Sequence, residues 1–211
     1  MYWGQPQDLV NLLYEIFATA YRNFIIKPFL NRIIRKFIKK GSKLLHAGCG
    51  SGQVDQGLRY WLKITAVDLS ANAVKQYQQI NYPYADAVIG DIRNLSFAEE
   101  SFDALYNLGV MEHFTDSEIE LSMKEFHRIL KVNGLAILFW PHSNSPMRLI
   151  LRLFSLVFNK KKDDLIPPEI NRLKSKEQIE TIAKSAGFKL EYYYFGLRDF
   201  YTQSVVVLKK V

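Results

Sequence analysis

The chain has 211 residues, of which 48% are apolar, so it can bury one substantial core and its length predicts a single domain. Its apolar runs are far shorter than the roughly 20 residues that a membrane-spanning helix requires, so no transmembrane span is expected. The N-terminus lacks a basic segment followed by an apolar one, and Cys49 is the only cysteine. We therefore expect a cytoplasmic protein with no disulfide and no metal site.

The net charge of +7 is concentrated near the N-terminus. No Asp or Glu lies between Ile16 and Val54, whereas eight Lys and Arg residues do. The rest of the chain holds 20 basic residues (28 minus 8) and 21 acidic ones, so it is nearly neutral. This distribution argues against a generally polycationic nucleic-acid binder and predicts one local basic surface.

Residues 1–40 are predicted to form an N-terminal helical cap. A helix beginning at Pro28 would carry its apolar side chains on one half of the wheel and Asn31, Arg32, Arg35, Lys36 and Lys39 on the other. Packing on the sheet with a solvated basic face is the common outcome for such a helix. Contact with an anionic membrane, a nucleic acid or an acidic partner is the alternative.

Residues 41–140 alternate short apolar runs with helical patterns, which predicts an α/β fold with a mainly parallel sheet. Strands are expected near residues 43–48, 64–69, 85–89, 102–107 and 134–140. A helix is expected between the last two, because Ile119, Met123 and Phe126 recur at helical spacing. Its predicted N-cap is Asp116 or Ser117, and its predicted stop is the pair at 133–134.

Residues 141–174 are expected to form a lid-like helical insertion, because 145–162 gives a helix with a wide apolar arc and a narrow polar strip. In residues 175–211 a helix is predicted over 175–186, with Ser175 and Gln178 as a capping box and an end at Gly187. Two β-rich runs follow. Their short link leaves no room for a helical crossover, so an antiparallel hairpin is expected.

Three alternate glycines, Gly48, Gly50 and Gly52, directly follow the first predicted strand. A strand, a glycine loop and a helix in this order place free backbone N–H groups beside a nucleotide-like ligand. The third glycine of the dinucleotide fingerprint is missing, which disfavours a nicotinamide cofactor. Asp68, at the end of the second strand, can accept hydrogen bonds from ribose hydroxyls. Asp91, after the third strand, suits an exocyclic amine better than a pyrophosphate.

The segments LLHAGCGSG, VDLS, GDIRNLSF, FDALYNLGVMEHF and LKVNGLAILFWP resemble, in order and spacing, the successive motifs of class I S-adenosylmethionine-dependent methyltransferases, in particular the small-molecule, type 11-like members. The resemblance covers roughly residues 40–210. It implies a Rossmann-like, doubly wound sheet of seven strands in the order 3-2-1-4-5-7-6 with strand 7 antiparallel, N-terminal helices and a helical insertion after strand 5. It also implies S-adenosylmethionine as cofactor and S-adenosylhomocysteine as product.

The same resemblance implies roles for individual residues. The glycine loop would pass under the methionine and ribose parts of the cofactor, Asp68 would hold the ribose hydroxyls and Leu69 would pack on the adenine. Asp91 and the Ile92 backbone would read the adenine edge, and the end of strand four would line the sulfonium end. The implied cofactor-binding set is His46, Ala47, Gly48, Cys49, Gly50, Gly52, Asp68, Leu69, Asp91, Ile92, Asn107 and Leu108.

His46 departs from the family pattern, which has Asp or Glu there to attract the cofactor's ammonium group. A neutral imidazole supplies no negative charge, so we expect weaker cofactor binding and a gain in affinity from His46→Asp. Cys49 is expected to be a small residue that fits the loop. Where an acceptor must lose a proton, the candidate bases are His113, of a Glu112-His113 pair, and His142. A structural role is the common one for each.

The predicted reaction is in-line displacement of the sulfonium methyl by a small, apolar or bulky acceptor, with peripheral membrane or lipid contact as an option. A nucleic-acid methyltransferase that uses the basic helix is one alternative. Against it, the residues after strand four are NLGV instead of an Asn/Asp-Pro-Pro-aromatic loop. A non-catalytic cofactor-binding member of the fold is the other alternative, because of His46.

Overall fold

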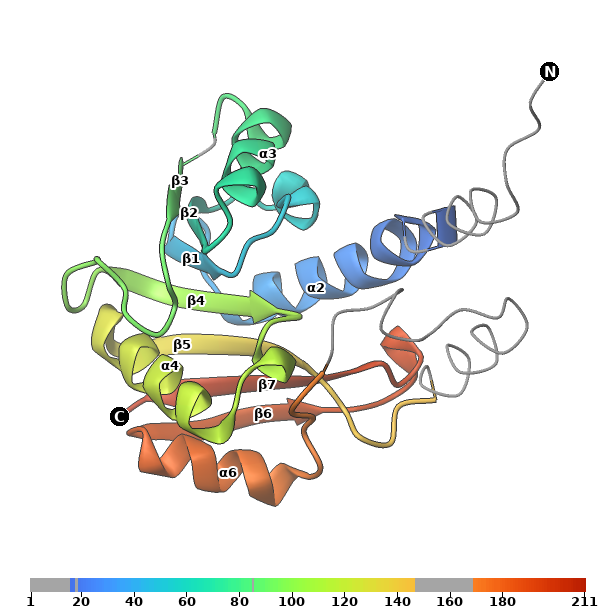
Figure 1. Ribbon diagram of the computed structural model, residues 1–211, viewed down its shortest axis with the longest axis vertical. Helices are drawn as coiled ribbons and strands as arrows, with labels where there is room; N and C mark the ends of the chain where they lie inside the picture. The colour runs from blue at the N-terminus through green and yellow to red at the C-terminus, as the bar shows by residue number, and fades with distance from the viewer. Residues whose placement is uncertain (1–15, 18, 85, 147–168) are drawn as a thin grey trace.

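The computed structural model describes residues 16, 17, 19–84, 86–146 and 169–211 (Figure 1). A seven-stranded sheet in the order β3-β2-β1-β4-β5-β7-β6 runs through it. Adjacent strands are parallel except that β7 is antiparallel to both β5 and β6, which confirms the predicted order and hairpin. The strands are β1 (Lys43–Ala47), β2 (Lys63–Asp68), β3 (Asp86–Ile89), β4 (Phe102–Leu108), β5 (Leu130–Pro141), β6 (Phe188–Tyr194) and β7 (Gln203–Lys210).

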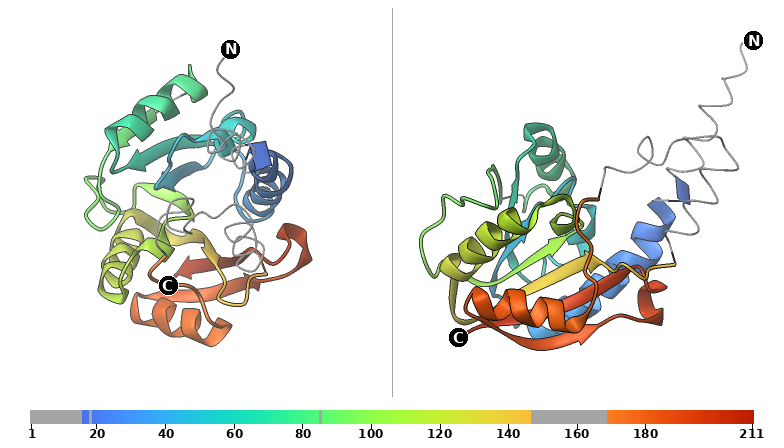
Figure 2. Two further views of the ribbon diagram at one scale, coloured as in Figure 1. Left: turned by 45° about the vertical axis from the view of Figure 1, so that its right-hand side comes forward. Right: turned by 60° about the horizontal axis from the view of Figure 1, so that its bottom comes forward.

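Helices cover both faces of the sheet (Figure 2). On one face lie α2 (Lys27–Phe37) and α3 (Ala71–Asn81), and on the other lie α4 (Asp116–Ile129) and α6 (Lys176–Ser185). Successive side chains of a strand point to opposite faces, so Leu44 joins the apolar cluster under α2 while Leu45 joins the one under α4 and α6. The central strands are therefore apolar on both sides, as expected of a parallel sheet with helices packed on both faces.

The helix expected from Pro28 is α2, and Pro28 lies in its first turn. The predicted apolar half is buried against the sheet, with Phe29, Leu30, Ile33 and Ile34 at its centre. Its N-terminal end lies beside the carboxyl ends of the parallel strands (Figure 1), because α2 runs antiparallel to the strand that follows it. The short π-helical segment before it, η1 (Arg22–Ile26), therefore reaches that edge of the sheet.

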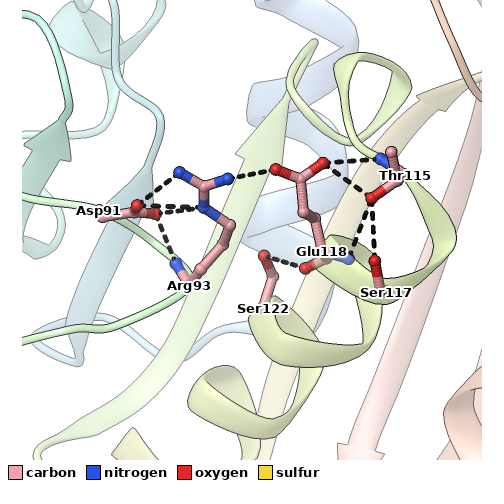
Figure 3. Close-up of polar contacts among 6 residues, drawn as sticks. All are labelled: Asp91, Arg93, Thr115, Ser117, Glu118 and Ser122. Carbon is pink, nitrogen blue, oxygen red and sulfur yellow. Dashed lines mark hydrogen bonds and ion pairs between the residues drawn. The ribbon is translucent and has the colours of Figure 1, made fainter.

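The structure corrects the predicted ends of α4. Its N-cap is Thr115 and not Asp116 or Ser117, because Thr115 forms a capping box with Glu118 (Figure 3). Glu118 Oε2 accepts from Thr115 N at 2.9 Å, and Thr115 Oγ1 accepts from Glu118 N at 3.4 Å. All three adjacent residues can cap a helix, and Ser117 also has a glutamate three residues later, Glu120, so the sequence alone does not identify the cap.

The other end of α4 also differs from the prediction, because the helix ends at Ile129 and β5 begins at once with Leu130. The pair Asn133-Gly134, expected to stop the helix, forms an irregularity within β5. Asn133 has φ of 63°, and a Cβ on Gly134 would lie 2.8 Å from the Lys131 carbonyl oxygen. The pairing of β4 with β5 shifts register at this point.

The C-terminal helix α6 has the predicted N-cap, since Ser175 accepts from Gln178 N, and Gly187 follows it with φ of 79°. The Gln178 side chain accepts from Lys174 N, so the predicted capping box is only half formed. Most of the expected lid-like insertion, including all but the first two residues of the helix predicted over 145–162, lies outside the described residues, as do residues 1–15 of the N-terminal cap. None of the described helices is long and apolar enough to span a membrane.

Candidate functional site

The loop after β1 turns through three left-handed glycines. Gly48, Gly50 and Gly52 have φ of 76°, 51° and 66°, a region that side chains disfavour. At two of these positions the surrounding atoms also leave no room for a side chain. A Cβ on Gly48 would lie 2.4 Å from Val110 Cγ2, and one on Gly52 would lie 2.1 Å from Tyr77 Cδ2. The alternate glycines thus allow the loop to fold tightly against its neighbours.

The predicted helix after this loop is not formed, and the loop N–H groups are not free. A short 3-10 helix, η2 (Gln53–Gly57), follows instead. Gly48 N and Cys49 N donate to Val67 O at 2.8 and 3.0 Å, and Gly50 N donates to Asp68 Oδ2 at 2.8 Å. That part of the prediction was wrong, because the loop folds back onto the end of β2. A ligand can still approach the backbone of the loop closely at its three glycines, which carry no side chains.

A cleft of about 320 Å³ lies over this loop. Its wall combines Arg22 of η1, His46 of β1, residues 48–54, Asp68 at the end of β2 and residues 108–110 after β4. Of the predicted set it brings together His46, Gly48, Cys49, Gly50, Gly52, Asp68 and Leu108. The other lining residues were not predicted: Arg22, Ser51, Gln53, Val54 and residues 109–110. Arg22 Nη1 donates to Gln53 Oε1 at 3.1 Å, which holds the guanidinium group at the wall.

Asp68 is half-buried at the edge of the cleft, with both carboxylate oxygens oriented by backbone groups. Oδ2 accepts from Gly50 N, and Oδ1 accepts from Ser70 N at 2.9 Å. Each carboxylate oxygen has further acceptor capacity, so Asp68 can still accept two hydroxyl donors from a ligand. A glycine-rich loop beside an oriented carboxylate fits the ribose and thioether parts of an adenosyl cofactor.

Asp91 does not line the cleft, and Arg93 binds its carboxylate in a fork (Figure 3). Arg93 Nε donates to Asp91 Oδ1 at 2.9 Å and Nη2 donates to Oδ2 at 2.7 Å, while Nη1 bonds Glu118. These hydrogen bonds hold the pKa of Asp91 below its usual range. Leu69 is exposed and Ile92 is buried in the core, so the adenine-reading roles of the three stay predictions.

Ala47 and Asn107 lie behind the cleft and join the ends of two strands. They are paired in register and fully buried, and Asn107 Nδ2 donates to Ala47 O at 2.6 Å. Asn107 Oδ1 is buried and has no hydrogen-bond partner among the described residues. Both residues support the wall of the site from inside.

The candidate bases lie away from the cleft wall. Asn144 N donates to His142 Nδ1 at 3.0 Å, so the proton of the neutral ring is on Nε2, and the ring stacks on Phe195 with centroids 4.0 Å apart. Burial lowers the pKa of His142. His113 closes the short 3-10 helix η3 (Met111–His113). These positions favour structural roles for both histidines.

Cys49 fills a small space in the loop. Burial, followed by the charges of Asp68 and Asp55, raises the pKa of the thiol to about 12. The thiol therefore stays protonated at neutral pH and is a poor nucleophile. This agrees with the expectation that Cys49 is a small residue that fits the loop.

His46 is buried beneath the loop against a carboxylate that the sequence analysis did not connect with it. Its Nδ1 is 2.8 Å from Asp55 Oδ2, and Asp55 is fully buried in η2. Two tyrosine hydroxyls, from Tyr77 of α3 and Tyr106 of β4, also donate to Asp55. The carboxyl group that position 46 lacks thus lies beside it, on Asp55.

Known proteins share this sequence pattern. A family model described as a methyltransferase domain matches residues 45–138. The chain is 28% identical over 128 residues to an uncharacterized methyltransferase of Synechocystis sp., covering 56% of this chain and 58% of that protein, so it spans little more than half of that relative. It is 24% identical over 168 residues to a demethylmenaquinone methyltransferase of Chlorobaculum tepidum, covering 72% of this chain and 67% of that protein.

Solved structures share the fold. The 1,6-didemethyltoxoflavin-N1-methyltransferase of Burkholderia thailandensis, solved with 1,6-didemethyltoxoflavin and S-adenosylhomocysteine bound, superposes with a TM-score of 0.68 at 15% identity. The match covers all of this chain and 92% of that one. At this identity the likeness shows the fold alone. The matched methyltransferase-domain model and the shared fold together support a class I S-adenosylmethionine-dependent methyltransferase.

Proposed function

We propose that this protein transfers the methyl group of S-adenosylmethionine to a small, apolar or bulky acceptor. The observation that carries the proposal is the cleft in which a glycine-rich loop meets the oriented carboxylate of Asp68. When bound, S-adenosylmethionine supplies a methyl group on a positively charged sulfur, which an acceptor nucleophile displaces in line. The chain then has to bind, align and desolvate, and these tasks need few catalytic side chains.

The residues of the cleft divide these tasks. Asp68 accepts the ribose hydroxyls, and residues 48–52 allow the ligand to approach the backbone closely. Leu108 and Val110 give an apolar wall at the end of β4, which excludes water from the reacting groups. Arg22 supplies a cation suited to the carboxylate of the methionine moiety. Leu69, Asp91 and Ile92 are proposed to contact the adenine.

An apolar or bulky acceptor is supported by the exposed aromatic side chains of the N-terminal segment. Phe24 is 80% exposed and lies two residues from Arg22, while Phe17 is 49% exposed and stacks on Tyr21. The relatives named above act on demethylmenaquinone and 1,6-didemethyltoxoflavin, both cyclic small molecules. A screen for cofactor-dependent methylation of a metabolite and lipid extract tests this class of acceptor. Methylation of RNA alone would contradict it.

Asp68→Asn is expected to weaken S-adenosylhomocysteine binding by about 10- to 100-fold, because it replaces charge-assisted hydrogen bonds to the ribose with neutral ones. Isothermal titration calorimetry measures the effect. Asp86→Asn is the matched control, since Asp86 is an exposed carboxylate of β3 that accepts from Thr65 outside the cleft. Equal loss in both variants, or no binding by the wild type, would contradict the proposed function.

A further inference from the structure

A row of exposed side chains follows the side of η1 and α2 that faces away from the sheet. Phe24, Pro28, Arg32 and Lys36 recur at intervals of four residues, and all four are exposed. Residues four apart lie on one side of a helix, so this row is opposite the apolar half that packs on the sheet (Figure 2). The outer face of α2 is defined here as the exposed residues Phe24, Pro28, Arg32, Arg35, Lys36, Lys39 and Lys40.

The five cations of the outer face have no acidic partner in the described part of the chain. The sequence holds no Asp or Glu between Ile16 and Val54, and none of the ion pairs among described residues involves residues 32–40. Asp103 shares a surface hollow with Lys39, but its carboxylate is paired with Lys131. The outer face is therefore a positive surface without internal compensation.

Contacts with aromatic rings orient two of these cations without neutralising them. The Arg35 guanidinium group lies 5.4 Å from the ring centre of Trp61, and Lys36 Nζ lies 4.2 Å from that of Tyr192. Both side chains are exposed. Their charges are thus held at the surface of the helix, where they can meet the anionic groups of a partner.

Apolar side chains gather at the N-terminal end of the same face. Phe24 is 80% exposed, and Ile16 and Phe17 before it are 56% and 49% exposed. Sites for single-stranded nucleic acid interleave aromatic rings with cations, because each base stacks on a ring while its phosphate meets a charge. Here the apolar residues precede the cations and include an aliphatic one, which is the pattern of a segment that inserts at one end and rests on charged headgroups along the remainder.

We propose that the outer face of α2 binds the surface of a bilayer that contains anionic lipids. Its lysines and arginines would contact the headgroups, and Phe24 with the neighbouring apolar side chains would enter the boundary of the acyl chains. The proposal goes beyond the proposed function and does not depend on it. Arg22, two residues before Phe24, lines the cleft, so the inserted end of the helix is also the end that borders the site.

Sedimentation with vesicles tests the proposal, using phosphatidylcholine vesicles with and without phosphatidylserine and the full chain without cofactor. At about 0.1 M salt the wild type should bind the anionic vesicles at least about 10-fold more tightly than the neutral ones. Raising the salt to about 1 M should remove this preference, because the screening length falls from about 10 Å to about 3 Å.

Combining Arg32→Gln, Lys39→Gln and Lys40→Gln should weaken binding to the anionic vesicles by about 100-fold, at about fivefold for each cation. These three side chains make no hydrogen bond, ion pair or ring contact with a described residue, so the variant should keep the thermal stability of the wild type. The matched control lowers the net charge equally on the opposite face of the sheet, at three exposed lysines of α6 and the residues before it, and should bind like the wild type: Lys174→Gln, Lys176→Gln and Lys184→Gln.

Phe24→Ser tests the insertion and should weaken vesicle binding by about 10-fold, because it removes apolar surface that the membrane would bury. Leu121→Ser is its control, since Leu121 is a 50% exposed apolar residue of α4, on the other face of the sheet, and its loss should leave binding unchanged.

Equal losses in the two triple variants would show that binding follows net charge alone and would overturn the proposal. Undiminished binding by Phe24→Ser, or equal binding to anionic and neutral vesicles, would overturn it as well. A wild type that binds a polyuridylate RNA and no vesicle would assign the cations to a nucleic acid instead. None of these results alters calorimetry with S-adenosylhomocysteine, so failure here would leave the proposed function standing.

Discussion

Gly52→Ala is expected to destabilise the protein by about 2–5 kcal/mol, whereas Gly50→Ala, two residues earlier in the same loop, should cost about 1–2 kcal/mol. Both glycines have a left-handed backbone, with φ of 66° and 51°, so both variants incur that conformational cost. They differ in the space around the added methyl group. The difference between them therefore isolates the packing of the loop.

The neighbours of Gly52 cannot easily move to make room for a methyl group. An added Cβ would lie 2.1 Å from Tyr77 Cδ2 and 2.8 Å from Asn81 Nδ2, and both neighbours are buried and hydrogen-bonded. Tyr77 cannot move away without breaking its bond to Asp55. No atom lies within 4 Å of the corresponding position on Gly50.

Urea unfolding of the two variants, followed by circular dichroism, measures this difference directly. Calorimetry with S-adenosylhomocysteine on the same samples shows how far the loop has moved, and Gly52→Ala should bind it more weakly than Gly50→Ala. Equal unfolding free energies for the two variants would mean that Tyr77 yields easily, and the account of the loop would then be wrong.

Glu112→Gln is expected to stabilise the protein by up to about 3 kcal/mol at pH 8 and to have little effect near pH 4.5. Glu112 is 6% exposed, and its Oε2 has no hydrogen-bond partner among the described residues. Burial raises the pKa of this carboxyl from 4.5 to about 7. Glutamine has nearly the same shape and never ionises, so it removes the cost of the buried charge.

The sign of the pH dependence follows from proton binding. Between pH 4.5 and 7 the folded protein keeps a proton on Glu112 that the unfolded chain has already lost. Stability contributed by this group therefore falls as pH rises through that window, and the full cost is present above pH 7. The gap from 4.5 to about 7 corresponds to about 3 kcal/mol at 1.36 kcal/mol for each pH unit.

Urea unfolding at pH 5, 6.5 and 8 measures this dependence. Glu120→Gln is the control on α4, because Glu120 is 59% exposed and, among the described residues, its ion pair is with Lys124 at the surface. The unfolding free energies of Glu112→Gln and the wild type should diverge steadily with pH, while Glu120→Gln should follow the wild type. Parallel curves for all three proteins would show that Glu112 ionises normally in the folded state.

The sheet could be predicted from the sequence because its signals are local. Each strand is a short apolar run bounded by turn residues, and the terminal hairpin follows from the length of one link. The apolar half of α2 was equally readable from its spacing. The ends of α4 were harder to predict. Several adjacent residues can act as the N-cap, and a pair such as Asn133-Gly134 is as compatible with a β-bulge as with the end of a helix.

The site was only partly predictable, because its contacts join distant parts of the chain. The glycine loop and Asp68 could be predicted from their spacing in the sequence. Tyr106 is 60 residues from His46 in the sequence and contacts it because β1 pairs with β4. One signal for Asp55 was available: it is the first acidic residue after a long acid-free segment. Arg22 was counted only as part of a basic surface, and no local pattern shows that η1 brings it to the cleft.

A crystal structure of the protein with S-adenosylhomocysteine tests the central claim most directly. The account predicts that the ligand occupies the cleft between the glycine loop and residues 108–110, with its ribose hydroxyls on Asp68. Ligand density at another surface, with Asp68 still bonded only to Gly50 and Ser70, would contradict it.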